Sequence, residues 1–117
     1  MTEDIEFSIV VPCYNEADGI AAFWARLQDV MATTGSRWEA IFVNDGSGDE
    51  TLTRLNALST EAAHIRIVDF SRNFGKEAAI TAGLDNVRGK ACIVIDADLQ
   101  HPPETILLMI KLWRDGA

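Results

Sequence analysis

Oxygen-bearing side chains alternate in the segment Asp96-Ala97-Asp98-Leu99-Gln100, which directly follows the apolar run Ala91–Ile95. In an extended segment every second side chain lies on the same side, so Asp96, Asp98 and Gln100 would face a common point. Carboxylate and amide oxygens suit magnesium or manganese, which takes one or two carboxylates and completes its coordination with water and substrate phosphates. An isolated Asp-X-Asp is common, and Asp98 could instead cap the next helix. The metal-site hypothesis therefore depends on the position of this segment at a strand end.

A second polar segment, Asn44-Asp45-Gly46-Ser47, follows the apolar run Trp38–Val43. The carboxylate of Asp45 could accept a hydrogen bond from a ribose hydroxyl or a base N–H, and glycine lets the chain turn sharply. Taken by itself, the segment is better explained as a turn that leads into a helix capped by Ser47 or Asp49.

The same region contains an altered dinucleotide-binding pattern, Gly46-X-Gly48-X-X-Thr51, with Asp69 at the end of the next predicted strand. Thr51 stands where this pattern requires glycine or alanine. Three acidic residues also crowd the helix start where an anionic pyrophosphate would bind: Asp45, Asp49 and Glu50. A dinucleotide-binding oxidoreductase domain is therefore a weak alternative.

Two basic residues, Arg72 and Lys76, lie among the acidic loops. They could neutralise a diphosphate, or they could form ion pairs with Asp69 or Glu77, and the sequence favours neither interpretation.

The hydrophobic pattern predicts elements of two alternating kinds. Nearly continuous apolar runs, typical of strands buried on both faces, cover residues 7–11, 38–43, 65–68 and 91–95, and Pro12 is expected to end the first. Apolar positions at helical spacing predict helices over 17–34, around 52–58, over 75–84 and from Pro102 onward. Successive β–α units predict an α/β fold, a mainly parallel sheet with helices on both faces. Ligands of such sheets bind beyond the carboxyl ends of the strands, where the polar segments fall.

Composition narrows the function classes further. With 117 residues, 48% of them hydrophobic, the chain can form one domain with a real core. A net charge of -8 argues against nucleic acid or an anionic membrane surface as a partner. No apolar run approaches the roughly 20 residues of a membrane span, and the acidic start is unlike a signal peptide. Cys13 and Cys92 lie in apolar runs and are expected to be buried, reduced thiols, which favours a cytoplasmic location.

In combination and in this order, four segments resemble the amino-terminal half of a family 2 glycosyltransferase with the Rossmann-like GT-A fold. They are Val11–Glu16, Val43–Ser47, Ser71–Ala79 and Asp96–Glu104. The last two are similar to those of transferases that attach sugars to polyprenyl phosphates. The resemblance covers nearly the whole chain. It implies a single domain over residues 1–117 that is the donor-nucleotide-binding half of a truncated catalytic domain.

The resemblance also implies roles for residues at matching positions. Asp96 and Asp98 would be catalytic, and Asp96, Asp98 and Gln100 would surround a magnesium or manganese ion. The nucleotide-sugar would contact Pro12, Tyr14, Glu16, Val43, Asp45, Arg72, Lys76, Asp96, Ala97 and Asp98. Asn44 stands where many family members carry an aspartate, which leaves Asp45 available for the donor.

The implied reaction is inverting transfer of a sugar from a nucleotide-diphospho-sugar to a polyprenyl phosphate. UDP-glucose is the favoured donor and a GDP-mannose donor is second. The acceptor half, any catalytic base and any membrane-anchoring helices are expected beyond Ala117. The fragment would then bind nucleotide and metal without turnover, and the full-length protein would lie at the cytoplasmic face of the inner membrane. The alternative from another class is a non-catalytic, flavodoxin-like module that binds nucleotide or metal.

Overall fold

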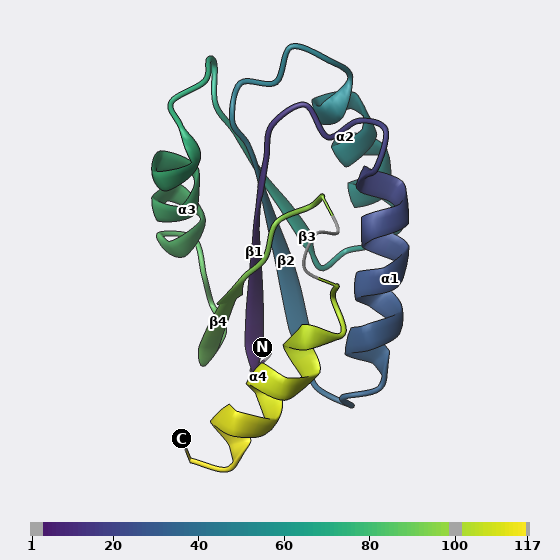
Figure 1. The fold of residues 1–117 in the computed structure, drawn as a ribbon, viewed down its shortest axis with the longest axis vertical. Helices are drawn as coiled ribbons and strands as arrows, with labels where there is room; N and C mark the ends of the chain where they lie inside the picture. Colours follow the sequence, from purple (N-terminus) through teal and green to yellow (C-terminus); the bar gives the residue numbers. More distant parts are fainter. Residues whose placement is uncertain (1–3, 99–101, 117) are drawn as a thin grey trace.

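The computed structural model describes residues 4–98 and 102–116. Within them strands and helices alternate along the chain (Figure 1). The elements are β1 (Phe7–Cys13), α1 (Ile20–Ala32), β2 (Trp38–Asn44), α2 (Thr51–Glu61), β3 (Ile65–Asp69), α3 (Lys76–Leu84), β4 (Ala91–Val94) and α4 (Thr105–Arg114). All neighbouring strands are parallel, in the order β3-β2-β1-β4. The predicted parallel α/β architecture is confirmed.

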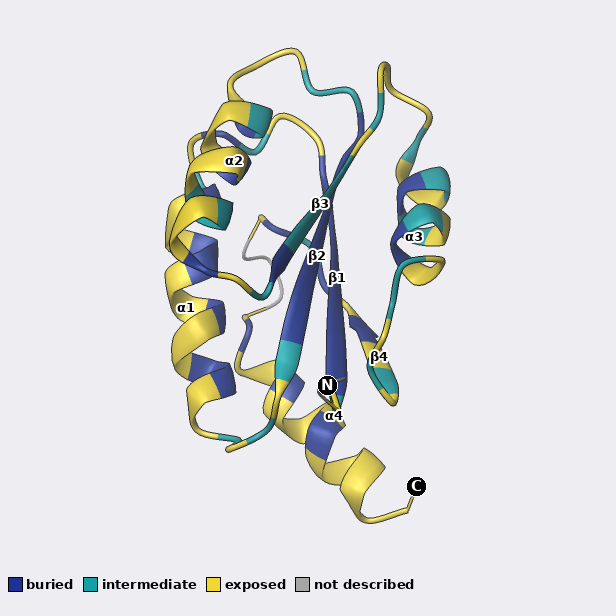
Figure 2. Cartoon of the chain, turned by 180° about the vertical axis from the view of Figure 1, so that it is seen from behind, coloured by how far each residue is buried: buried dark blue, intermediate teal, exposed yellow. Residues whose placement is uncertain are grey.

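Helices cover both faces of the sheet, as predicted. Helices α1, α2 and α4 lie on one face and α3 lies on the other (Figures 1 and 2). On the first face, β1 residues such as Ile9 and Val11 pack with α1 residues such as Phe23 and Leu27. On the second face, Ile41 and Val43 of β2 pack against Ala79 of α3. Strands β1 and β2 are therefore buried on both sides, which explains their continuous apolar sequences.

The prediction that Pro12 ends the first strand is wrong, because β1 continues to Cys13 and Pro12 pairs with Val43. The carbonyl of Val10 accepts a hydrogen bond from Ile95 on the β4 side, and that of Cys13 accepts one from Asp45 on the β2 side. Because sides alternate along a strand, Pro12 faces the β4 side. Strand β4 ends opposite Val10, so the missing N–H of proline leaves no strand partner unpaired.

Other boundaries differ by a few residues. Helix α1 begins at Ile20 because residues 17–19 form a turn, and α4 begins at Thr105 after a turn that contains both prolines. Cys92 is exposed, contrary to the prediction, since it lies on β4 at the edge of the sheet, beyond the cover of α3. No helix in the described ranges has the length and apolar character that crossing a membrane requires.

At the amino end of the sheet, Glu39 of β2 is 0% exposed and ionically paired. Ser8 donates its hydroxyl to Glu39 at 2.5 Å, the backbone N–H of Arg88 donates at 2.8 Å, and Arg66 donates at 3.0 Å. Burial by itself raises the pKa of Glu39, but these hydrogen bonds outweigh it and hold the pKa below its usual range. Glu39 thus links β1, β2 and β3 with the loop that precedes β4. This network lies at the opposite end of the sheet from the polar loops.

Candidate functional site

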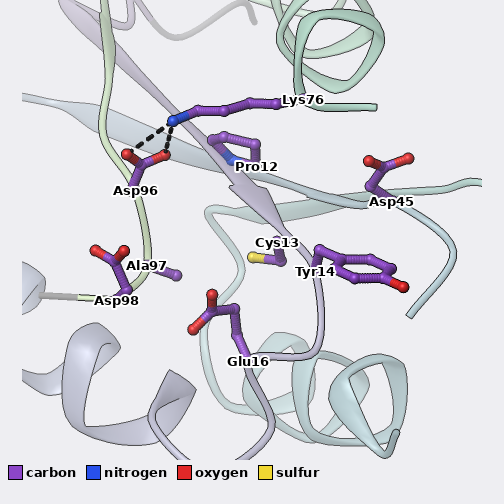
Figure 3. A pocket seen from close by; sticks show the side chains of 9 residues that line it. All are labelled: Pro12, Cys13, Tyr14, Glu16, Asp45, Lys76, Asp96, Ala97 and Asp98. Atoms are coloured by element: carbon purple, nitrogen blue, oxygen red, sulfur yellow. Dashed lines mark hydrogen bonds and ion pairs between the residues drawn. The ribbon is translucent and has the colours of Figure 1, made fainter. Parts of the chain in front are cut away.

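The loops at the carboxyl ends of the strands enclose a cleft of about 280 Å³. It is lined by Pro12, Cys13, Tyr14, Glu16, Asp45, Lys76, Asp96, Ala97 and Asp98 (Figure 3). The first four come from the end of β1 and the loop after it, and the last three follow β4. The sequence segments predicted to carry chemistry therefore meet at one place, which is the carboxyl edge of a parallel sheet.

Asp96 and Asp98 border the same opening, together with Glu16 from the β1–α1 loop (Figure 3). Lys76, at the start of α3, reaches Asp96: its Nζ lies 2.8 Å from one carboxylate oxygen and 2.9 Å from the other. Lys76 thus pairs with Asp96, and not with Asp69 or Glu77, the partners that one of the two sequence interpretations offered. One wall of the cleft is consequently acidic, with a single ammonium against Asp96 among the residues that line it.

The crowding of acids affects the pKa values of two neighbouring groups, Glu16 and Cys13. Burial raises the pKa of Glu16, and the charges of Asp98, Asp49 and Asp96 raise it further. Burial also raises the pKa of the Cys13 thiol, with contributions from Glu16 and Asp96. Cys13 is therefore a neutral thiol in the floor of the cleft. Its place in the lining was missed from sequence because an apolar strand context indicates a core residue.

Replacing Glu16 with glutamine is expected to stabilise the folded chain at pH 7 by about 0.5–1 kcal/mol, because it removes a carboxylate repelled by its neighbours. The folded pKa is raised, so the charged form is destabilising above the ordinary glutamate pKa of about 4.3. The gain should disappear below that pH, where Glu16 is protonated in both states. Urea denaturation at pH 7 and pH 3.5 measures the effect, and equal stability at pH 7 would contradict it.

Asp45 is buried and holds the loop before α3 in place. One carboxylate oxygen accepts the backbone N–H of Phe74 at 2.7 Å, and the other accepts that of Gly75 and the side-chain amide of Asn73, each at 3.1 Å. These contacts fix the approach to α3, which begins with Lys76. The proposed contact of Asp45 with a base or ribose would use an acceptor position that these donors leave available.

Gly46 lies directly against the backbone of the loop that follows β3. It has φ of +64°, and a Cβ atom placed on it would lie 2.1 Å from the carbonyl carbon of Arg72 and 2.2 Å from the nitrogen of Asn73. A side chain at this position would therefore displace backbone. Glycine is required here both by conformation and by space.

The loops after β1 and β2 are joined by further hydrogen bonds. Asn15, with φ of +53°, donates its N–H to Ser47 at 3.0 Å and accepts that of Gly48 at 2.8 Å. Asn44 donates its amide to Asp69 and accepts the hydroxyl of Ser47. An aspartate at position 44 could not donate to Asp69, which gives a physical reason for asparagine in this chain.

Asp49 occupies the start of α2, where a dinucleotide pyrophosphate would have to bind. Its carboxylate accepts the N–H of Thr51 at 2.9 Å and that of Ala17 at 3.2 Å. Hydrogen bonds from Thr51 hold the pKa of Asp49 below its usual range, so it is ionised. The anionic carboxylate already fills this helix start, which counts against the dinucleotide alternative.

Three predicted site residues lie outside the cleft or outside the described ranges. Val43 is fully buried against α3 and its side chain does not line the cleft. The guanidinium of Arg72 lies over the ring of Phe74, 4.7 Å from its centroid, and also does not line the cleft. Gln100 falls outside the residues that the structure describes.

The residues present fit a divalent cation that is shared with a phosphate ligand. Within residues 4–98 and 102–116, no three His, Cys, Asp or Glu side chains are placed to hold a metal together. Magnesium and manganese do not require such a cage, since one or two carboxylates suffice when substrate phosphates complete the coordination. Asp96 and Asp98 border one cleft and would supply such a donor set if a metal bound there.

Comparison of this parallel sheet and its cleft with solved structures identifies the class of fold, that of the GT-A glycosyltransferases. The structure of mannosyltransferase PcManGT from Pyrobaculum calidifontis, solved with GDP-Man and Mn²⁺, matches this chain with a TM-score of 0.76 and 22% sequence identity. That match covers 98% of this chain and 34% of that one. The family model of glycosyl transferase family 2 matches residues 8–117, and the chain belongs to that family.

Two relatives extend the comparison at the level of sequence. YkcC of Bacillus subtilis (strain 168), described as an uncharacterized glycosyltransferase, is 50% identical over 116 residues, which are 99% of this chain and 36% of YkcC. The bactoprenol glucosyl transferase of Shigella phage SfV is 41% identical over 113 residues, which are 97% of this chain and 37% of that protein. The chain thus spans little more than a third of the length of these relatives.

Proposed function

We propose that this chain forms the donor-binding part of an inverting glycosyltransferase that moves a sugar from a nucleotide-diphospho-sugar to a polyprenyl phosphate. The observation that carries the proposal is the convergence of Asp96, Asp98 and Lys76 on one cleft in a family 2 chain. The bactoprenol glucosyl transferase among its relatives supports a polyprenyl phosphate acceptor and glucose as the sugar. We propose UDP-glucose as the donor. The relatives' greater length leads us to assign acceptor binding and any membrane anchor to parts of the whole protein outside residues 1–117.

Each side of the cleft has a distinct part in this proposal. Pro12, Tyr14 and Asp45 would border the nucleoside, and Tyr14 is exposed enough to contact it. Asp96 and Asp98 would hold magnesium or manganese, with Gln100 as a further proposed ligand. When bound, the metal supplies positive charge that stabilises the departing nucleoside diphosphate.

The proposed acceptor, a polyprenyl phosphate, does not need a strong base to deprotonate it. A phosphate monoester has its second pKa near ~6, so it is largely ionised at neutral pH and can attack the anomeric carbon directly. The phosphate oxygen forms the new bond while the bond to the nucleoside diphosphate breaks on the opposite face, which inverts the configuration. The protein's contribution at this step is to orient the donor and balance its charge.

Isothermal titration of UDP and GDP, each with and without Mn²⁺, tests donor binding by this chain. We expect metal-dependent binding, tighter for UDP. The Asp98→Asn variant should lose at least about 10-fold in affinity, because removing even a group that only supports a metal ligand costs about 10- to 100-fold. Asp115→Asn, which removes a charge at the end of α4, is the matched control and should bind as the unmodified chain does.

Three outcomes would contradict parts of the proposal. Tight binding of NAD without metal would favour the oxidoreductase alternative, and equal affinity of the Asp98→Asn and Asp115→Asn variants would remove Asp98 from the site. Preference for GDP over UDP would leave the transferase class intact but would overturn UDP-glucose as the donor.

A further inference from the structure

Lys76 makes a two-point contact with the carboxylate to which the proposed function assigns the metal. Its Nζ lies 2.8 and 2.9 Å from the two oxygens of Asp96, as the dashed lines in Figure 3 show. Both side chains border the acidic cleft and also an adjoining groove of about 440 Å³ whose lining includes Ile80, Ile93 and Met109. The ion pair is therefore the boundary between the two spaces, and the ammonium occupies space beside Asp96 that a cation ligand would need.

The position of Lys76 in α3 does not account for this contact. Lys76 is the first residue of the helix, where unpaired N–H groups favour negative charge and disfavour a cation. Glu77, the next residue, meets that preference. A lysine at this position therefore interacts unfavourably with the start of α3, and the ion pair with Asp96 offsets that interaction.

The ion pair is also easily exchanged. The Lys76 side chain is 59% exposed and that of Asp96 is 29% exposed, and ion pairs this open to water contribute little net stability. A divalent cation interacts with a carboxylate at a given distance twice as strongly as an ammonium does, before hydration is considered. Exchange of one cation for the other at Asp96 needs no movement of the backbone, because the lysine side chain is long and flexible.

We propose that Lys76 and the divalent metal compete for the Asp96 carboxylate, so that metal binding releases the ammonium toward the diphosphate of the donor. This inference rests on the proposed function. In the metal-free chain, the charges of Lys76 and Asp96 neutralise each other. Asp96 therefore attracts the metal less strongly, and Lys76 attracts the diphosphate less strongly. When the metal takes Asp96, both positive groups face the same cleft, and metal and diphosphate each strengthen the binding of the other.

The test measures Mn²⁺ binding in the absence of nucleotide, by titration calorimetry or electron paramagnetic resonance. Lys76→Gln removes the competitor and should bind Mn²⁺ about two- to fivefold more tightly than the unmodified chain, the factor expected for loss of an exposed ion pair. Lys90→Gln removes the same charge just before β4, at the opposite end of the strand, and controls for the change in net charge. Lys76→Arg should restore weak Mn²⁺ binding.

A second measurement follows the ammonium itself. The ¹⁵Nζ signal of Lys76 should shift on addition of Mg²⁺ to the unmodified chain, and that of Lys90 should not. The inference is overturned if Lys76→Gln binds Mn²⁺ no more tightly than Lys90→Gln, even where UDP still binds with metal. If UDP fails to bind under any condition and Mn²⁺ does not bind, the proposed function fails together with this inference.

Discussion

Gly46→Ala is expected to lower the free energy of unfolding by about 2–4 kcal/mol, the combined cost of a left-handed backbone and an overpacked contact. The new methyl group would lie 2.1 Å from the carbonyl carbon of Arg72, so the loops after β2 and β3 must separate. The adjacent residue, Asp45, would then lose its hydrogen bonds to the loop before Lys76. Urea denaturation measures the stability, and calorimetry with UDP and Mn²⁺ should show weaker binding by the folded chain.

Gly35→Ala is the matched control for this prediction. Gly35 has φ of +65°, nearly the same as Gly46, but a Cβ atom on it would meet nothing within 4 Å. Its replacement should cost about 1–2 kcal/mol, the conformational part of the effect, with nucleotide affinity unchanged. If the two variants were equally destabilised, contact with the Arg72 backbone would not be what makes Gly46 necessary.

Glu39→Ala is expected to lower the free energy of unfolding by about 2–4 kcal/mol. Removing one member of a buried ionic network leaves its partners without compensation, at a cost of about 3–5 kcal/mol when they are fully buried. Here Arg66 and Arg88 are partly exposed and can turn toward water, so we expect a smaller loss in the free energy of unfolding. The hydroxyl of Ser8 is fully buried beside Glu39 and cannot turn toward water. Chemical denaturation at pH 7 provides the measurement.

The Glu39 prediction also has a pH signature. Because the folded pKa is lowered, the stabilising contribution is complete above the ordinary glutamate pKa of about 4.3 and is lost as the pH falls below it. The difference between the unmodified chain and Glu39→Gln, which keeps the shape and removes the charge, should therefore narrow as the pH falls from about 5 to below the ordinary glutamate pKa. A difference that stayed constant over this range would exclude the carboxylate charge as its source.

Much of the fold was predictable because it depends on local patterns. The β-branched run at Ile9–Val11 and the helical spacing from Ile20 to Met31 reflect burial that the structure confirms. The convergence of the polar segments was predictable too, since parallel strands bring their carboxyl ends to one edge. Cys92 was mispredicted because an apolar neighbourhood does not reveal that β4 lies at a sheet edge.

The detailed contacts of the site could not be predicted in the same way. The pairing of Lys76 with Asp96 joins residues on different elements, and local acids at positions 69 and 77 offered equally good charge partners. Likewise, the three donors that Asp45 receives come from a loop nearly thirty residues away. Such contacts depend on the register and spacing of whole elements, which residue types alone leave undetermined.

Hydrogen bonds join Asn15 to Ser47 and Gly48, and Gly46 packs closely against the loop after β3. These contacts have a thermodynamic consequence for ligand recognition. They make the side of the cleft that we propose to bind the nucleoside a preassembled surface, so the entropy cost of ordering these loops is met during folding, before any ligand arrives. On the proposed phosphate side, by contrast, our inference has Asp96 exchange Lys76 for the metal when the donor binds. Amide hydrogen exchange should accordingly be slow in the joined loops even without ligand, and ligand binding should change it little there.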